Sequence, residues 1–273
     1  MKIEKSSPFH SNVVLLTGAS AGIGRELALQ LSDQGARLAL AARTKDPLER
    51  TAADCRSRGG EVLALSTDVS DPDQCAALVR NTVERYGRID TLINNAGVTM
   101  YGYFDRVTDL KLFETLFRVN VLGSIYCTHY ALPYLKQSAG RIVGISSLTG
   151  KTGVPTRSGY AATKHAMAGF FDSIRIELAG SGVTVTMIYP GFVRTGMREH
   201  ALGSDGKPVG QSHLDERGVM PVERCAGLIW KAAAGRRREL VLSARGRIGV
   251  WLKLIAPGLV DRLAFSAIRT GRT

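Results

Sequence analysis

The chain has 273 residues, of which 44% are hydrophobic and 22% are charged, and its formal net charge at pH 7 is +12. This length and composition predict a single folded domain over residues 1–273 and exclude an intrinsically disordered chain. The four cysteines lack CxxC spacing, so we expect neither a zinc site nor a disulfide framework. The first twelve residues lack an apolar signal region, and no charge-free run of about 18 apolar residues occurs. We therefore expect a cytoplasmic protein without a membrane span.

Short apolar runs alternate with helical patterns along the chain, which is typical of βαβ units. Runs that are apolar at nearly every position suit parallel strands buried on both faces. We therefore predict an α/β fold: a Rossmann-type doubly wound parallel sheet of about seven strands with helices on both faces. The predicted strands are residues 13–16, 37–41, 62–65, 91–93, 141–145, 183–188 and 239–242.

The first predicted strand leads into a glycine-rich turn, Thr17 to Gly24, and then into an amphipathic helix. Glycines let the backbone turn tightly and approach a pyrophosphate, while the start of a helix offers free N–H groups and the positive end of its dipole. We interpret the turn as a dinucleotide site; the alternative is a tight strand-to-helix connection without a ligand. The cofactor contacts predicted in this turn are Gly18, Ser20, Gly22, Ile23 and Gly24.

Arg43 follows the second predicted strand, at the position where NAD-binding proteins place an acid about 20 residues beyond the glycines. An acid would bind the ribose 2′-hydroxyl and repel a phosphate. Arginine can instead pair with a 2′-phosphate and stack on adenine, and the Ser20 hydroxyl can add a contact to the same phosphate. Arg43 therefore predicts NADP(H) as the cofactor, against the alternative of a solvated arginine at a strand end.

Tyr160 and Lys164 are four residues apart in a predicted helix, which places them on one face. A cation about 4 Å from the phenol at an effective dielectric of about 20 contributes roughly 4 kcal/mol, or about three pKa units. The phenol of Tyr160 would then exchange protons near neutrality. Reduction of a carbonyl needs such a general acid beside the oxygen when hydride reaches the carbon.

These motifs together make the chain resemble the short-chain dehydrogenase/reductase family over roughly residues 10–243. The match comprises the glycine turn, the segment Asn94-Asn95-Ala96-Gly97, a helix asparagine at Asn120, and Ser147, thirteen residues before Tyr160. The Arg43 pattern and the basic tail resemble the branch that contains hydroxysteroid and other lipid-carbonyl reductases. Ala21 is a departure, because several NADP-linked relatives have a basic residue there.

The resemblance implies roles for individual residues. Ser147 would orient the substrate oxygen, Tyr160 would exchange the proton, Lys164 would lower the pKa of Tyr160 and hold the nicotinamide ribose, and Asn120 would position a water. Family members are usually dimers or tetramers, so we expect a homodimer or homotetramer. The further cofactor contacts that it implies are Asp68, Val69, Asn95, Ala96, Gly97, Tyr160, Lys164, Pro190, Gly191, Val193 and Thr195.

The expected substrate is a lipophilic carbonyl compound or secondary alcohol. We expect its contacts to come from residues 98–104, 148–157 and 196–210, the last of which would close as a lid. Apolar and aromatic side chains are frequent in these segments, although such residues more often pack a core. The candidates are Met100, Tyr101, Tyr103, Phe104, Val154 and Met197.

Residues 244–273 form a basic amphipathic extension. Between Arg236 and Thr273 there are nine Lys or Arg and two acids, and Trp251 and other apolar residues recur among them at helical spacing, with Pro257 expected to kink or divide the helix. This mixture favours a peripheral membrane contact, or packing on the body of the protein or on another subunit, over nucleic-acid binding, which we do not expect. The rival to the enzyme is a non-catalytic NADP-binding regulator or scaffold, because a fold alone does not fix an activity.

Overall fold

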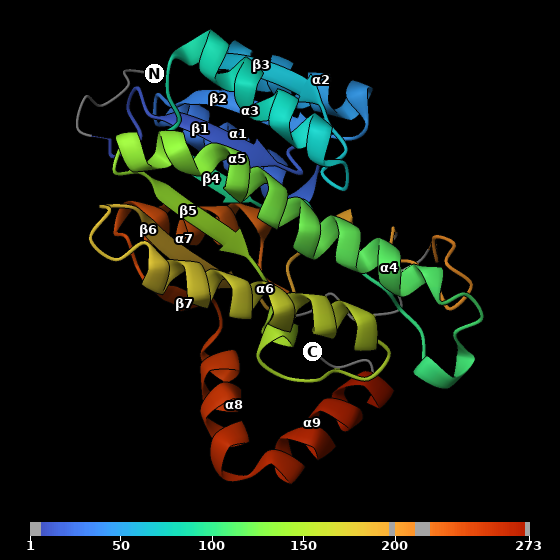
Figure 1. The fold of residues 1–273 in the computed structure, drawn as a ribbon. Coiled ribbons are helices and arrows are strands. Elements are labelled where there is room, and N and C mark those ends of the chain that lie inside the picture. Colours follow the sequence, from blue (N-terminus) through green and yellow to red (C-terminus); the bar gives the residue numbers. More distant parts are fainter. Residues whose placement is uncertain (1–6, 197–199, 211–218, 271–273) are drawn as a thin grey trace.

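A computed structural model describes residues 7–196, 200–210 and 219–270. In that part of the chain, seven parallel strands form one sheet in the order β3-β2-β1-β4-β5-β6-β7 (Figure 1). The predicted fold class is confirmed, and each predicted strand agrees with the observed one to within one residue. The strands are β1 (Val13–Thr17), β2 (Arg37–Ala42), β3 (Glu61–Ser66), β4 (Thr91–Asn94), β5 (Arg141–Ile145), β6 (Thr184–Tyr189) and β7 (Glu239–Val241).

Helices cover both faces of the sheet, as parallel strands require, because each crossover returns along one face. One face carries α1 (Gly22–Asp33), α2 (Lys45–Ser57) and α7 (Val222–Ala234). The other carries α3 (Pro72–Tyr86), α5 (Gly123–Gln137) and α6 (Ser158–Glu177), with the short helix α4 (Lys111–Phe117) leading into α5 (Figure 1).

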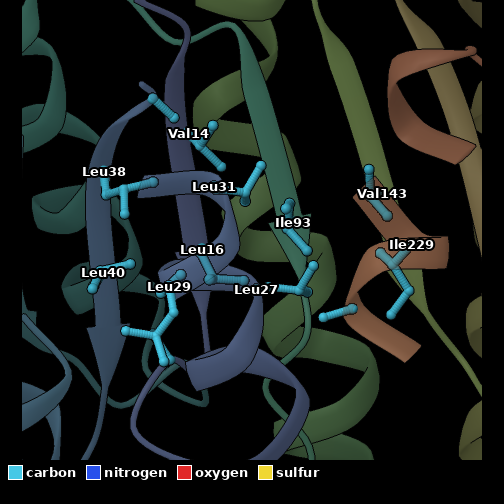
Figure 2. Close-up of a cluster of buried hydrophobic side chains, with 14 of the residues drawn as sticks. Val14, Leu16, Leu27, Leu29, Leu31, Leu38, Leu40, Ile93, Val143 and Ile229 are labelled. Atoms are coloured by element: carbon cyan, nitrogen blue, oxygen red, sulfur yellow. The ribbon is translucent and has the colours of Figure 1, made fainter. Parts of the chain in front are cut away.

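Alternate residues of each strand enter two separate cores. Val14 and Leu16 pack with Leu27 of α1 and Ile229 of α7, as Figure 2 shows. Val13 and its alternate neighbours pack against α3, α5 and α6 on the opposite face. Burial on both faces is the physical reason that these strands are apolar at consecutive positions rather than at every second one.

The order in which strands are added to the sheet reverses at β1: β2 and β3 lie on one side of it, and β4 to β7 lie on the other. Crossovers on either side of that point run to opposite faces and leave a crevice beyond the carboxyl ends of β1 and β4. The glycine turn follows β1 and the segment Asn95 to Gly97 follows β4, so both predicted motifs lie at this crevice.

The C-terminal extension forms two helices, α8 (Ala244–Ile255) and α9 (Pro257–Thr270). Pro257 begins the second helix, where its missing N–H costs nothing, so the predicted division of the helix at this proline is confirmed. The two helices make a V that projects from the body of the molecule (Figure 1). Among the described helices, none is long and apolar enough to cross a membrane.

Candidate active site

A cavity of about 520 Å³ lies at the carboxyl ends of β1, β4, β5 and β6. Most of the residues predicted from the sequence line it. They are Gly18, Ser20, Gly22, Ile23, Gly24, Asn95, Ala96, Gly97, Ser147, Tyr160, Lys164, Pro190, Gly191, Val193 and Thr195.

The conformation of the glycine turn is fixed by the side chains of Asn95 and Thr17. Asn95 donates from Nδ2 to the carbonyl oxygens of Thr17 and Gly18, at 3.0 and 3.1 Å. The Thr17 hydroxyl accepts from the backbone N–H of Asn95 and of Ala96, at 3.0 and 3.1 Å. Asn95 and Thr17 therefore fix the turn that follows β1 against the turn that follows β4.

Two glycines of the turn are required by space. Gly18 has a φ of +66°, and a Cβ there would lie 2.8 Å from the Cα of Ala96. A Cβ on Gly24 would overlap the carbonyl oxygen of Gly18. The first turn of α1 can approach the end of β1 this closely only because both positions lack side chains.

The N-terminus of α1 is open toward the cavity. Its N-cap residue, Ala21, offers no side chain to the first N–H groups, and no acid stands in the first turn. Thr195 lies across from this helix end, since a Cβ on Gly22 would be 3.2 Å from its side chain. Uncapped N–H groups beside a glycine cradle fit the pyrophosphate of a dinucleotide cofactor.

Arg43, Asp68 and Val69 lie outside the residues that line the cavity. Arg43 is exposed directly after β2, and Ala41, two residues earlier, accepts from the N–H of Ala19 in the glycine turn at 3.1 Å. The carboxylate of Asp68 accepts from the backbone and the hydroxyl of Ser70. Val69 is buried against Gly123 of α5. These three residues are placed beyond the glycine turn, on the β2–β3 side of the site.

The two serines after β5 have different surroundings. Ser146 is buried, and its hydroxyl donates to the carbonyl of Lys164 at 3.1 Å, which ties β5 to α6. Ser147 also lines the cavity; its hydroxyl accepts from the N–H of Thr149 at 3.2 Å and is close enough to Tyr160 to lower the pKa of the phenol. Both serines line the cavity, and the one selected by its spacing from Tyr160 is the one whose hydroxyl acts on the phenol.

Tyr160 and Lys164 do lie on one face of α6, but their electrostatics differ from the sequence prediction. Nζ of Lys164 donates to the carbonyl of Ile145 at 2.9 Å and lies 5.7 Å from the centre of the Tyr160 ring. Burial lowers the pKa of Lys164 to about 7, so at pH 7 only about half of the protein molecules carry a charged ammonium at this position. Burial raises the pKa of Tyr160, while the charge of Arg157 and the Ser147 hydrogen bond lower it. Lys164 is not among the groups that lower the pKa of Tyr160 in this arrangement, and its expected effect on the phenol stays a prediction.

Asn120 is fully buried behind the cavity wall, in a π-helical turn, Arg118–Leu122, between α4 and α5. Its amide accepts from the N–H of Val98 at 2.8 Å and donates to the carbonyl of the same residue at 2.9 Å. It also donates to the hydroxyl of Thr163 at 2.9 Å. Asn120 therefore joins three segments of the site, and π turns inside helices are frequent at functional positions.

The substrate side of the cavity differs in part from the predicted set. Val154 lines it, whereas Met100 is fully buried against Tyr160, and Tyr103 and Phe104 are exposed outside it. Tyr101 lies beneath the guanidinium of Arg157, and Met197 falls outside the described residues. The sequence prediction included Arg157 only as the last residue of the range 148–157. The feature that could have identified it is a cation directly before the helix that carries Tyr160.

The described part of the predicted lid is attached to the cavity wall. Leu202 donates to the carbonyl of Thr99 at 2.9 Å and accepts from the N–H of Tyr101 at 2.8 Å. Residues 200–210 thereby extend the segment that follows β4. The predicted closing motion of this segment stays a prediction.

Comparison with known proteins relates this fold and site to enzymes. A family model described as short chain dehydrogenase matches residues 12–204. The chain is 36% identical over 263 residues to 11-beta-hydroxysteroid dehydrogenase 1A of Arabidopsis thaliana, covering 94% of this chain and 75% of the relative. It is 32% identical over 269 residues to a dehydrogenase/reductase SDR family protein 7-like of Dictyostelium discoideum, covering 96% and 84%.

Solved structures agree with the sequence relatives. A short chain dehydrogenase/reductase from Burkholderia phymatum, solved in complex with NAD, superposes with a TM-score of 0.79 at 26% identity, covering 97% of each chain. Levodione reductase superposes with a TM-score of 0.77 at 26% identity, covering 86% of this chain and 97% of that one. Both similarities extend over at least 86% of this chain.

Proposed function

Since this chain belongs to the short-chain dehydrogenase/reductase family of oxidoreductases, we propose that it transfers hydride between NADP(H) and a lipophilic carbonyl compound or secondary alcohol. One observation carries the proposal: Ser147, Tyr160 and Lys164 line the same cavity as the open N-terminus of α1. A proton-exchanging group and a dinucleotide cradle within one cavity are what carbonyl reduction requires.

Tyr160 is the proposed general acid. When bound, the nicotinamide supplies or accepts the hydride. In the reductive direction Tyr160 gives its phenolic proton to the carbonyl oxygen, so that one hydride and one proton convert C=O to CH–OH. The raised pKa of Tyr160 keeps the phenol protonated at neutral pH, which suits an acid. Ser147 lines the same cavity and lowers the pKa of the phenol, which supports a role for its hydroxyl in holding the same oxygen.

Lys164 and Asn120 are proposed to position and resupply this acid. Gly97 separates them: a Cβ on Gly97 would lie 3.2 Å from Oδ1 of Asn120 and 3.7 Å from Nζ of Lys164. With a pKa of about 7, Lys164 can hold or release a proton near neutrality and return one to Tyr160. Asn120 keeps its place by the hydrogen bonds to Val98 and Thr163.

The test of the acid is the Tyr160→Phe variant. Steady-state oxidation of NADPH is measured against a panel of lipophilic ketones and aldehydes, and loss of a general acid predicts a fall in kcat of at least about a hundredfold. NADPH binding, followed by its fluorescence, should be retained. Wild-type turnover in the variant would remove Tyr160 from its role, whereas silence of both proteins with NADPH still bound would favour the regulator or scaffold.

Arg43 supports the choice of NADP(H), because it is exposed beside the glycine turn and no acid stands at the end of β2. Arg43→Ala should raise the KM for NADPH about 10- to 100-fold, the usual worth of a charge-assisted contact, and leave that for NADH nearly unchanged. Arg50→Ala, which removes another exposed arginine from α2, is the control. An unchanged preference for NADPH over NADH would refute the cofactor assignment.

The α8–α9 hairpin is proposed to contact a membrane surface. Exposed apolar side chains, Trp251 and Leu254 among them, lie on it together with Arg245, Arg247 and Lys253. Apolar groups beside basic ones suit an interface with anionic lipid. Ala264 of α9 also lines the cavity, so a lipophilic substrate would enter near the hairpin.

A further inference from the structure

Arg157 is a buried cation that no described acid balances. Its side chain is only 8% exposed and lines the cavity. The ion pairs formed among the described residues do not include it; its recorded contacts are one hydroxyl and one aromatic ring. A charge taken out of water without a counter-ion costs several kcal/mol, so the fold by itself gives no reason for an arginine here.

The position of Arg157 in the secondary structure makes this cost larger. It is the N-cap residue of α6, where the helix dipole presents its positive end. Side chains that cap this end are usually Ser, Thr, Asp or Asn, which accept hydrogen bonds from the first N–H groups, whereas a guanidinium can only donate. A positive charge at this place is favourable only when an anion lies beside it.

The rest of the cavity supplies no such anion. Among the described residues that line it, none is Asp or Glu, and the other ionisable groups are Tyr160, Lys164 and His200. The open N-terminus of α1 makes the other end of the cavity positive as well, and a pyrophosphate fits there. The Arg157 end is therefore a second positive region within the same cavity.

The guanidinium is held in place with donors left over. Nη1 donates to the hydroxyl of Thr99 at 3.1 Å, and the group stacks over Tyr101 with 5.4 Å between Cζ and the ring centre. Nε is buried without a hydrogen-bond partner, and no described residue accepts from Nη2. A carboxylate that reaches this fixed planar group from the cavity can therefore be met by a charge-assisted donor that no protein group already uses.

We propose that Arg157 is the anchor for a carboxylate on the substrate, so that the compound reduced or oxidised at Tyr160 is a lipophilic oxo or hydroxy acid. The inference rests on the proposed function only for the identity of the reacting group, since anion binding by Arg157 does not need turnover. Val154, Leu148 and Phe192 line the same cavity and supply the apolar surface for the remainder of such a molecule.

The experiment compares decanoate with decanamide, two probes of similar length that differ in charge. Calorimetric titration is carried out on protein saturated with NADPH, so that the anion site of α1 is already filled. Decanoate should bind at least about tenfold tighter than decanamide, the ratio expected for a buried charge-assisted pair. Equal affinities would overturn the proposal. Failure of NADPH to bind or of Tyr160 to act is seen separately, in the NADPH titration and the Tyr160→Phe assay.

Three variants identify the residue responsible. Arg157→Gln should abolish the preference for decanoate, and Arg157→Lys, which keeps the charge but not the planar guanidinium, should retain part of it. Arg106→Gln is the matched control, because Arg106 stacks on Tyr103 with 5.6 Å from Cζ to the ring centre but is exposed outside the cavity. A decanoate preference that survives in Arg157→Gln would assign the anion site elsewhere.

A readout of stability separates ligand binding from a structural role. Arg157→Gln removes an unpaired buried charge, so its Tm without ligand should equal or exceed that of the wild type, while the rise in Tm caused by decanoate should be lost. A lowered Tm with an unchanged decanoate response would show that Arg157 only supports the fold. Equal binding of the two probes, with a shifted pH profile of turnover in Arg157→Gln, would show that it acts on Tyr160 instead.

Discussion

Lys164 shows how burial changes the chemistry of a residue that sequence spacing had identified. Its side chain is 3% exposed and donates to a main-chain carbonyl and to the sulfur of Met167. Neither partner carries a negative charge, so nothing offsets the loss of hydration, and the pKa falls to about 7. The lysine thus becomes a group that exchanges protons at neutral pH, in place of the permanent cation that sequence reasoning assumed.

This pKa makes stability depend on pH. The unfolded chain keeps Lys164 near its ordinary pKa of 10.5, so between pH 7 and that value the unfolded state binds more protons and stability rises with pH. Lys164→Met removes the ionisable group and should be more stable than the wild type at pH 7. Its advantage should shrink by roughly 2 kcal/mol at pH 9, because a pKa difference of one is worth about 1.4 kcal/mol.

Urea unfolding of both proteins at pH 7 and pH 9 measures this difference. Comparison of variant with wild type at each pH cancels the contributions of the buried tyrosines and cysteines, which both proteins share. A difference in unfolding free energy that is the same at the two pH values would contradict neutralisation of Lys164 in the fold.

At the scale of elements, the site is built where helices begin at the carboxyl ends of strands. The start of α1 packs onto the end of β1 through Gly24, and the start of α6 carries Arg157 and Tyr160. The π turn that holds Asn120 lets one side chain meet Val98 after β4 and Thr163 on α6. The main-chain geometry therefore orients each of these side chains, and a small change in packing should alter the affinity for NADPH.

Gly24→Ala tests this packing. The added methyl group would overlap the carbonyl oxygen of Gly18, so α1 must shift away from β1. We expect a fall in Tm and at least about a tenfold weaker binding of NADPH, because the N–H groups at the start of α1 move with the helix. Differential scanning fluorimetry and NADPH fluorescence titration measure the two effects.

Gly169→Ala is the matched control, since Gly169 lies inside α6 and a Cβ there would meet nothing within 4 Å. Alanine is favoured over glycine in a helix interior by up to about 1 kcal/mol, so this variant should be slightly more stable and bind NADPH normally. Equal behaviour of the two alanine variants would mean that the close approach at Gly24 is unimportant.

At the scale of the whole molecule, the sheet and the α8–α9 hairpin differ in how far their apolar side chains are buried. The inner strands bury their side chains on both faces, whereas the hairpin exposes Trp251, Leu254 and Ile255 at 70%, 73% and 84%. Exposed apolar groups gathered on one projecting element mark a contact surface. The positive charge of the chain is concentrated in the same region, which favours an anionic partner.

Replacing Trp251, Leu254 and Ile255 together by Gln should abolish co-sedimentation with vesicles of phosphatidylcholine and phosphatidylserine at a ratio of about 3:1, because apolar burial provides most of the binding energy. Turnover of a water-soluble carbonyl substrate should be unchanged. Ile176→Gln, at an exposed position on α6, is the control. Loss of a dimer in size-exclusion chromatography, with no vesicle binding by the wild type, would assign the surface to a second copy of the chain.

Two features of the protein follow from the sequence without the structure. Apolar runs predict the seven strands, and the spacing of Ser147, Tyr160 and Lys164 assigns the catalytic residues to one helix and to the end of the strand before it. Such signals are local, because periodicity and turn residues act over a few neighbours. Only the tertiary structure decided which donors and charges meet. Asn95 donates to the carbonyls of Thr17 and Gly18, burial lowers the pKa of Lys164, and Arg157 lies near Tyr160 without a described acid beside it. Hydration and pairing of a charge depend on segments distant in the chain, and no local pattern records them.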